Sequence, residues 1–244
     1  MIKRMVIFMA EKESGKIYVV ATPIGNLQDI TFRAVEVLNN VDFIVCEDTR
    51  VSGILLSHYG IEKKLKVLNA RNESRTTDEI IEEVKSGKDC ALISDAGTPL
   101  ISDPGSRLIN KAVAEDINVA PVPGPSALTA ALSVSGLPSS SFVFDGFLPQ
   151  KKGRQKKLEQ LSRESRTIVL YESTYRIEKL LKELSVYMPE RTVVVCRELT
   201  KKFEDVWRGK PSELLEELPS KNTKGEFVVI ISPLEWTDHD YSES

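Results

Sequence analysis

The sequence predicts an α/β protein of two domains, and three observations support this fold class. Over the first 135 residues, short apolar runs alternate with segments whose apolar residues have helical spacing. This alternation is typical of a mainly parallel sheet with helices on both faces. The 244 residues suffice for two domains of about 120 residues each. A small, polar segment at 136–141 is the best linker, so we predict domains over 15–135 and 136–234 and a polar tail over 235–244.

Turn and cap residues delimit the elements of the first domain. Thr76 and Glu79 have the spacing of a capping box, Asp103 can cap a helix with Pro104 in its first turn, and Gly136 can end a helix. The predicted strands are 16–21, 42–46, 65–68, 90–93 and 118–122. The predicted helices are 31–40, 51–59, 76–84, one that follows Asp103, and one from Pro125 to Gly136.

The second half is less regular, so we expect a second α/β sheet domain whose strands are mixed in direction. Its predicted strands are 141–144, 167–171, 192–196 and 227–231, and its predicted helices are 158–163, 174–187 and 212–218.

Composition limits the partners of the chain. The net charge is only -3, so a nucleic-acid partner requires a local basic patch. Three scattered cysteines in apolar runs indicate reduced core thiols, and two histidines cannot form a His-rich metal site. The apolar run within residues 1–10 is short for a signal peptide, and no run has membrane-spanning length. We therefore expect a cytoplasmic protein.

The segment SDAGTPLISDPG (residues 94–105) is the most informative loop. It follows an apolar run, so it lies at the carboxyl end of a strand, where ligands bind in open α/β sheets. Its glycines permit close approach of a ligand and its prolines fix the loop. The alternative interpretation is a rigid turn and helix cap.

Three other turns are expected at the same edge of the sheet: residues 21–27, 47–50 and 122–127. Neither the GxGxxG nor the GxxxxGK[ST] pattern occurs, which disfavours ordinary phosphate-binding loops and favours a ligand without phosphates. The acids and arginine of EDTR (residues 47–50) predict substrate positioning or an acid/base pair. The alternative is a helix cap with a surface ion pair.

Charged residues in the second half also follow apolar runs, at residues 171–176 and 197–201. Helix caps with solvated charges are an equal alternative there. The basic run at residues 151–157 suits the binding of a phosphate backbone, and a solvated helix start is the alternative interpretation. No aromatic residues interleave with this run. Its candidate RNA-binding residues are Lys151, Lys152, Arg154, Lys156 and Lys157.

Eight motifs in order resemble the bacterial ribosomal RNA small-subunit methyltransferase I family of the tetrapyrrole methylase superfamily. They are TPIGNLxDIT (22–31), EDTR (47–50), SDAGTPLISDPG (94–105), PGPSA (123–127), GFLP (146–149), YEST-R (171–176), RELTK (197–201) and KGEFV (224–228).

The resemblance implies two α/β domains with S-adenosylmethionine in the cleft between them, and a homodimer. It also implies methylation of the ribose 2′-hydroxyl of a cytidine in the decoding region of 16S rRNA, as naked RNA or in the small ribosomal subunit. The implied cofactor-binding residues are Pro23, Ile24, Gly25, Asn26, Asp95, Ala96, Gly97, Thr98, Pro99, Ile101, Ser126, Ala127, Tyr171, Leu199 and Thr200.

Methyl transfer to a hydroxyl requires in-line positioning and a group that takes the proton, whereas no metal is required because the sulfonium already activates the methyl. The candidate catalytic residues are Glu47, Asp48, Arg50 and Lys201, and further candidates for substrate handling are Glu172, Arg176 and Arg197. Asp48 or Glu47 is the predicted proton acceptor, with Lys201 next.

Two other functions are compatible with the motifs. A tetrapyrrole C-methyltransferase of the precorrin type has the same fold, but a small anionic ring does not need so extended a basic run. A noncatalytic RNA-binding protein of this fold is the third interpretation, and titration with S-adenosylmethionine separates it from the enzymes.

Overall fold

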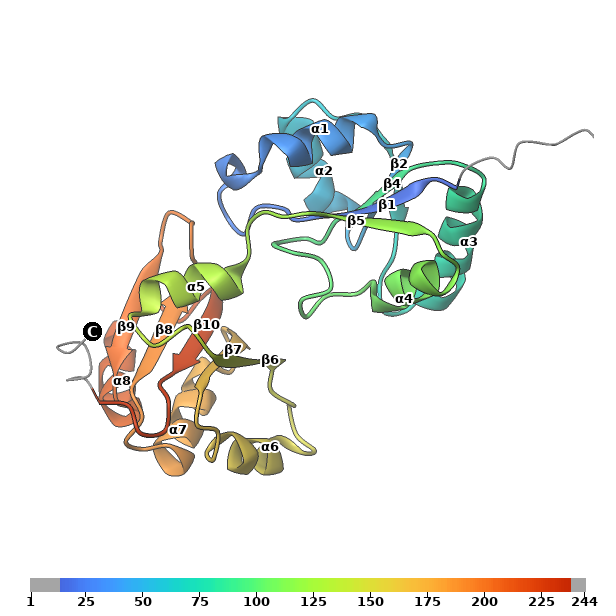
Figure 1. Ribbon diagram of the computed structural model, residues 1–244. Helices are drawn as coiled ribbons and strands as arrows, with labels where there is room; N and C mark the ends of the chain where they lie inside the picture. Colours follow the sequence, from blue (N-terminus) through green and yellow to red (C-terminus); the bar gives the residue numbers. More distant parts are fainter. Residues whose placement is uncertain (1–13, 238–244) are drawn as a thin grey trace, which may run out of the picture. The chain divides into compact units, whose positions relative to one another are not determined.

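The computed structural model describes residues 14–237, and these form two α/β units (Figure 1). The first contains the described residues up to Pro23 together with Asp29–Gly124. The second contains Ile24–Gln28 and the described residues from Pro125 onward. The prediction of two α/β domains is therefore confirmed. Residues 1–10 and most of the tail, from 238 onward, lie outside the described residues.

The first unit is built on a five-stranded, all-parallel sheet in the order β3-β2-β4-β1-β5. Its strands are β1 (Lys16–Val20), β2 (Phe43–Cys46), β3 (Lys64–Val67), β4 (Cys90–Leu92) and β5 (Asn118–Val122). Its α-helices are α1 (Phe32–Asn40), α2 (Thr49–His58), α3 (Glu73–Lys85) and α4 (Ser106–Ala114). The short 3-10 helix η1 (Leu27–Asp29) follows β1.

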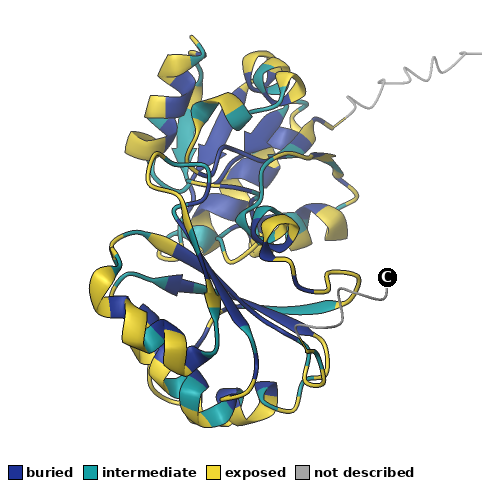
Figure 2. Ribbon diagram, turned by 90° about the vertical axis from the view of Figure 1, so that its left-hand side faces the viewer, coloured by how far each residue is buried: buried dark blue, intermediate teal, exposed yellow. Residues whose placement is uncertain are grey.

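Successive side chains of the buried strands point to opposite faces of the sheet and form one hydrophobic core on each face. Ile44 and Cys46 of β2 pack with α1 and α2, whereas Phe43 and Val45 pack with α3 and α4. The strands are consequently buried between more exposed helices (Figure 2). The connections after the neighbouring strands β1 and β4 leave toward opposite sides of the sheet. The carboxyl ends of these two strands therefore form the topological switch point at which ligands bind in this class of sheet.

The second unit has a mixed sheet in the order β6-β7-β10-β8-β9, as predicted. Only β10 and β9 run opposite to the other strands. The carboxyl ends of β6, β7 and β8 and the amino end of β10 therefore share one edge. The strands are β6 (Phe142–Phe147), β7 (Thr167–Ser173), β8 (Val193–Arg197), β9 (Asp205–Gly209) and β10 (Glu226–Ile231). The helices are α5 (Ala127–Ser135), α6 (Arg154–Leu161), α7 (Ile177–Tyr187), α8 (Pro211–Glu217) and η2 (Leu218–Ser220).

The boundary between the units differs from the predicted one at 135/136. Helix α5 belongs to the second unit, because its Ala131 and Leu132 are buried with Val194 and Ile230 of the second sheet. The opposite face of that sheet is covered by α6, α7 and α8. The helical pattern of 127–135 continues the alternation of the first half, so the pattern alone assigned it to the wrong sheet.

Several element boundaries also differ from the prediction. Helix α3 begins at Glu73 after Asn72, so Thr76 lies inside the helix and forms no capping box. Helix α4 begins after Gly105, whose φ of 114° favours glycine, so Asp103 belongs to the loop. Helix α6 begins at Arg154 instead of 158, and α5 begins at Ala127 after Pro125. Strand β9 was missed because charged residues interrupt its apolar pattern.

Within residues 14–237, no helix is long and apolar enough to cross a membrane.

Candidate functional site

Two motif loops are joined at the switch point of the first sheet. The backbone N–H of Thr22 donates to the carbonyl of Gly97 at 2.9 Å, and the N–H of Gly97 donates back at 3.0 Å. The Thr22 hydroxyl also donates to the carbonyl of Ser94 at 3.1 Å. These bonds bring Pro23 beside the loop that holds residues 95–101, as the sequence predicted for the first unit.

The loop after β4 has an unusual backbone. Leu100 and Ser102 adopt φ values of 75° and 70°, and Gly97 has a φ of 82°. A non-glycine residue in this region costs of order 1–3 kcal/mol, and such residues cluster at functional sites. The strained backbone at two non-glycine positions favours a binding loop over a plain turn.

A group of carboxylates lies at the same edge. Burial raises the pKa of Glu47, and the neighbouring charges of Asp95, Asp103 and Asp48 raise it further. Burial likewise raises the pKa of Asp95 and of Asp103. The backbone N–H of Asp48 donates to Asp95 Oδ1 at 3.3 Å, which joins the loops after β2 and β4. Glu47 is therefore a stronger base than an ordinary glutamate.

Asp48 has the opposite character. Its carboxylate caps α2 by accepting from the N–H of Arg50 at 2.8 Å, and it binds the Arg50 guanidinium at 3.0 Å. Hydrogen bonds from Arg50 lower the pKa of Asp48 to about 2. Asp48 is thus a poor proton acceptor, which favours Glu47 over Asp48 as the predicted base. The structure agrees with the alternative interpretation of these two residues, a helix cap with a surface ion pair.

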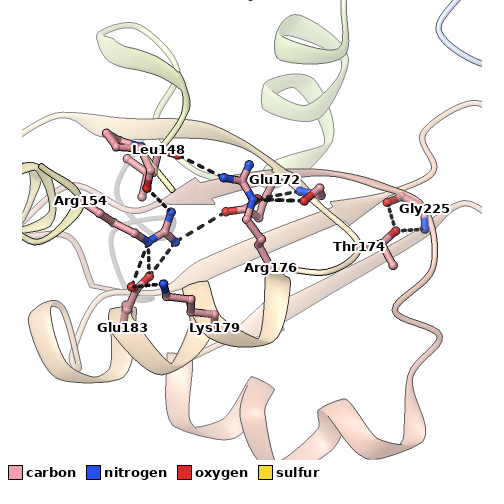
Figure 3. Close-up of polar contacts among 10 residues, drawn as sticks. Leu148, Arg154, Glu172, Thr174, Arg176, Lys179, Glu183 and Gly225 are labelled. Atoms are coloured by element: carbon pink, nitrogen blue, oxygen red, sulfur yellow. Dashed lines mark hydrogen bonds and ion pairs between the residues drawn. The ribbon is translucent and has the colours of Figure 1, made fainter. Parts of the chain in front are cut away.

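Three motifs of the second unit are tied together at one edge of its sheet. The Thr174 hydroxyl donates to the carbonyl of Gly225 and accepts from its N–H, both at 2.7 Å (Figure 3). Glu198 Oε1 accepts from the N–H of Glu226 at 3.0 Å. Because β10 is antiparallel to β7 and β8, its first residue lies beside their last residues. The motifs YEST-R, RELTK and KGEFV therefore converge.

Lys201 lies within this edge. Its Nζ is 2.8 Å from Glu198 Oε1 and 2.8 Å from Glu226 Oε2. Burial lowers the pKa of Lys201, but the hydrogen bonds to these two carboxylates outweigh that effect and the pKa is raised. A lysine with a raised pKa is a poor proton acceptor, which argues against its predicted role as a base. Its charge holds the RELTK and KGEFV loops together.

The cofactor-binding candidates of the second unit form one neighbourhood. Ile24, Leu199, Ala127 and Tyr171 belong to a single apolar cluster. A Cβ on Gly25 would lie 2.3 Å from Lys201 Cγ and 3.1 Å from the Leu199 carbonyl oxygen, so only glycine fits there. Ser126 is the N-cap residue of α5, and Asn26 Oδ1 accepts from the N–H of Gln28.

Thr200 supplies a further observation, because its buried Oγ1 has no hydrogen-bond partner among the described residues. Its φ of 65° is also strained. A buried hydroxyl without a partner is costly unless a ligand or water satisfies it. Apolar walls, a glycine at close approach and an unused hydroxyl fit the adenosyl group of S-adenosylmethionine, which carries few charges and several polar atoms.

A buried ionic network lies beneath the YEST-R turn (Figure 3). The carboxylate of Glu172 is 2.7 Å from Arg176 Nε and 3.7 Å from Arg154 Nη2. Arg154 also binds Glu183 through Nε, at 2.8 and 2.9 Å, and donates to the Pro149 carbonyl at 3.2 Å. Arg154 is therefore buried, and its predicted role as a surface RNA contact is corrected.

Two further substrate candidates are structural. Glu172 is buried within the network, and the buried Arg197 donates to the carbonyls of Lys224, at 2.7 Å, and Phe203, at 2.8 Å. Neither side chain is accessible to a macromolecular substrate.

We define the basic surface as Lys151, Lys152 and Lys156, which are exposed, with the half-buried Lys157 at its edge. Lys157 Nζ lies 2.8 Å from Asp145 Oδ1, so part of its charge is neutralised. Two aromatic residues of the same unit, Phe147 and Tyr175, were missed, because the sequence does not reveal that their rings are exposed.

The two α/β units and the glycine- and proline-rich loops define a methylase-type fold. Residues 16–215 match the family "Tetrapyrrole (Corrin/Porphyrin) Methylases". A uroporphyrin III C-methyltransferase from Thermus thermophilus has a TM-score of 0.65 at 17% identity, covering 90% of this chain and 98% of its own. A diphthine synthase has a TM-score of 0.70 at 15% identity, covering 90% of both chains.

Closer sequence relatives narrow the class. The chain is 45% identical to "Ribosomal RNA small subunit methyltransferase I" of Thermotoga maritima over 89% of its length and 98% of that protein. It is 49% identical to the protein of that name from Xylella fastidiosa, over 89% of this chain and 81% of the relative. The chain belongs to the tetrapyrrole methylase family and, within it, to the group of these ribosomal RNA small subunit methyltransferases.

Proposed function

We propose that this protein transfers a methyl group from S-adenosylmethionine to ribosomal RNA of the small subunit. The single observation that carries the proposal is identity of 45–49% over about nine-tenths of the chain to proteins named for this reaction. The finer proposal is that the acceptor is the ribose 2′-hydroxyl of a cytidine in the decoding region of 16S rRNA. The eight-motif resemblance supports that choice of acceptor.

S-adenosylmethionine, when bound, supplies an electrophilic methyl on a sulfonium. We propose that two groups of residues contact it. Pro23 and residues 95–101 form the first group, on the joined loops of the first unit. The second group comprises Ile24, Gly25, Asn26, Ser126, Ala127, Tyr171, Leu199 and Thr200. Their backbone groups and apolar side chains orient the donor and exclude water, which is most of what an in-line transfer requires.

Glu47 is the proposed proton acceptor for the ribose hydroxyl. Its raised pKa makes the carboxylate a better base than Asp48, whose pKa is held down by Arg50. Because an ordinary carboxylate is a weak base for a sugar hydroxyl, proton transfer accompanies methyl transfer late in the transition state. The exposed side chain of Arg50 is the proposed contact to a phosphate of the substrate.

The acid limb of the pH profile follows from this assignment. Glu47 must be ionised, so turnover with saturating donor falls as pH drops through its raised pKa, at a higher pH than for an ordinary glutamate. Asp103→Asn removes a neighbouring negative charge and lowers the pKa of Glu47, so the limb moves to lower pH. Single-turnover rates across a pH series measure the acid limb of the wild type and that of the variant. If the acid limb of Asp103→Asn stays at the wild-type pH, the charge of Asp103 does not raise the pKa of Glu47.

The basic surface is proposed to bind the RNA backbone. Replacing Lys151, Lys152 and Lys156 by Gln removes three phosphate contacts, so the log–log salt slope of RNA binding becomes smaller in magnitude by about 2. Lys182→Gln, on an exposed helix pair with Glu178, is the matched control. Filter binding across a salt series measures the slope. An unchanged slope in the triple variant would mean that the basic surface does not bind the RNA backbone.

Mapping of 2′-O-methyl groups in rRNA from cells with and without this protein tests the function. We expect one cytidine of the decoding region to lose its methyl group and to regain it when purified protein, donor and small subunits are combined. Transfer to a precorrin instead of RNA supports the tetrapyrrole alternative. Absence of measurable S-adenosylmethionine binding supports the noncatalytic alternative. A homodimer and a cytoplasmic location remain predictions, which native mass and cell fractionation test.

A further inference from the structure

Two exposed aromatic side chains of the second unit lie on segments that one arginine joins. Tyr175, in the turn between β7 and α7, is 95% exposed, and Phe147, the last residue of β6, is 50% exposed. Arg176 follows Tyr175 in the chain, and its guanidinium carbon lies 5.8 Å from the centre of the Phe147 ring. Isolated exposed apolar residues are ordinary, but an exposed aromatic ring in contact with a guanidinium group forms a surface with its own chemistry.

Hydrogen bonds, an ion pair and ring packing fix the positions of Arg176 and Phe147. Arg176 is fixed by Glu172 at 2.7 Å and donates to the Leu148 carbonyl at 3.3 Å (Figure 3). Arg154 holds the next residue through the Pro149 carbonyl. The Phe147 ring also packs edge-on against Tyr171, with centroids 5.7 Å apart. The segment that carries Phe147 and leads into the basic surface is therefore positioned before any ligand binds.

We propose that Phe147, Tyr175 and Arg176 form a stacking surface for an unpaired nucleobase of the RNA substrate. This inference rests on the proposed function and adds a second contact beside the basic surface. Aromatic rings and guanidinium planes stack on bases of any sequence, and the adjoining lysines Lys151 and Lys152 suit the phosphates that flank such a base. Glu172 and Glu183 balance the charges of Arg154 and Arg176, so the positive charge offered to the RNA comes from the exposed lysines of the basic surface.

Tyr175→Ala is the decisive variant because an exposed side chain can be removed without disturbing the fold. We expect its affinity for a single-stranded decoding-region oligoribonucleotide to fall between about 5-fold and about 150-fold. Tyr175→Phe keeps the ring and restores binding. The salt slope stays unchanged, since no phosphate contact is lost. Phe32→Ala, which removes an equally exposed ring from the first unit, is the matched control and leaves binding unchanged.

Fluorescence anisotropy with the labelled oligoribonucleotide, alone and annealed to its complement, measures these affinities. Wild-type affinity in Tyr175→Ala, or an equal loss for the duplex, overturns the stacking surface. A protein partner for Tyr175 is indicated instead if RNA binding is unchanged but the variant loses a pull-down contact. Methyl transfer is measured in parallel. If the protein methylates RNA but Tyr175→Ala has no effect on binding, the proposed function stands and the stacking surface is wrong. If binding depends on the Tyr175 ring but no methyl group is transferred, the stacking surface stands and the proposed function is wrong.

Discussion

Glu47→Gln is expected to lower the rate of methyl transfer about 10²- to 10⁴-fold at saturating donor and RNA, the usual contribution of a general base. Glutamine keeps the size of the side chain and its hydrogen-bonding capacity but cannot take the ribose proton. The carboxylates that surround Glu47 lose a repulsive neighbour, so the loop is not weakened. Single-turnover methyl transfer to small subunits measures the rate, and calorimetry with S-adenosylmethionine measures donor binding, which we expect to be unchanged.

Asp48→Asn is the matched control for this experiment. Asparagine also caps helices well, so α2 keeps its amino-terminal cap. Because the pKa of Asp48 is about 2, its carboxylate contributes little as a base, and we expect less than about a 10-fold loss of rate. If both variants bind the donor and keep wild-type turnover, no carboxylate of the EDTR motif is the base. If only Asp48→Asn is inactive, the assignment to Glu47 is wrong.

The strand ends of the first sheet were predictable because the chain marks them strongly. In the first unit every strand is parallel, so each motif that follows an apolar run lies at one edge. Local patterning therefore placed residues such as Pro23 and Gly97 at the same edge. Strand β5 and the Gly136 helix end were predicted with the observed limits, since Gly136 adopts the left-handed conformation that favours glycine.

The roles of individual charged side chains were not predictable in the same way. Arg154 lies in a run of lysines, and nothing local distinguishes it from them. It is buried because Glu172 and Glu183, far along the chain, supply carboxylates beneath α6. The raised pKa of Glu47 depends likewise on Asp95 and Asp103, which lie far along the chain, whereas the pairing of Asp48 with Arg50 is local and matches the helix-cap alternative. Burial and pairing are properties of the fold, so sequence spacing alone cannot assign them.

Glu172→Gln is expected to destabilise the protein by about 3–5 kcal/mol, the usual effect of removing one partner from a buried ion pair. Its carboxylate is buried and faces two guanidinium groups, of which Arg154 is also buried. The amide brings an N–H group toward those cations and removes the compensating charge. Urea unfolding at neutral pH measures the change. Glu178→Gln, on an exposed pair with Lys182, should change stability by less than about 1 kcal/mol.

A double-mutant cycle separates the ionic coupling from the loss of packing. Arg154→Met keeps an apolar side chain of similar length at the start of α6 but removes its contacts to Glu172, Glu183 and Pro149. The double variant should be more stable than the sum of the single changes predicts, by about 1–3 kcal/mol, because the second substitution removes a charge that the first had left without its partner. Additive losses would mean that the two side chains act independently. The 3.7 Å approach of Arg154 to Glu172 would then carry no energetic coupling, and Arg176 alone would balance the buried carboxylate.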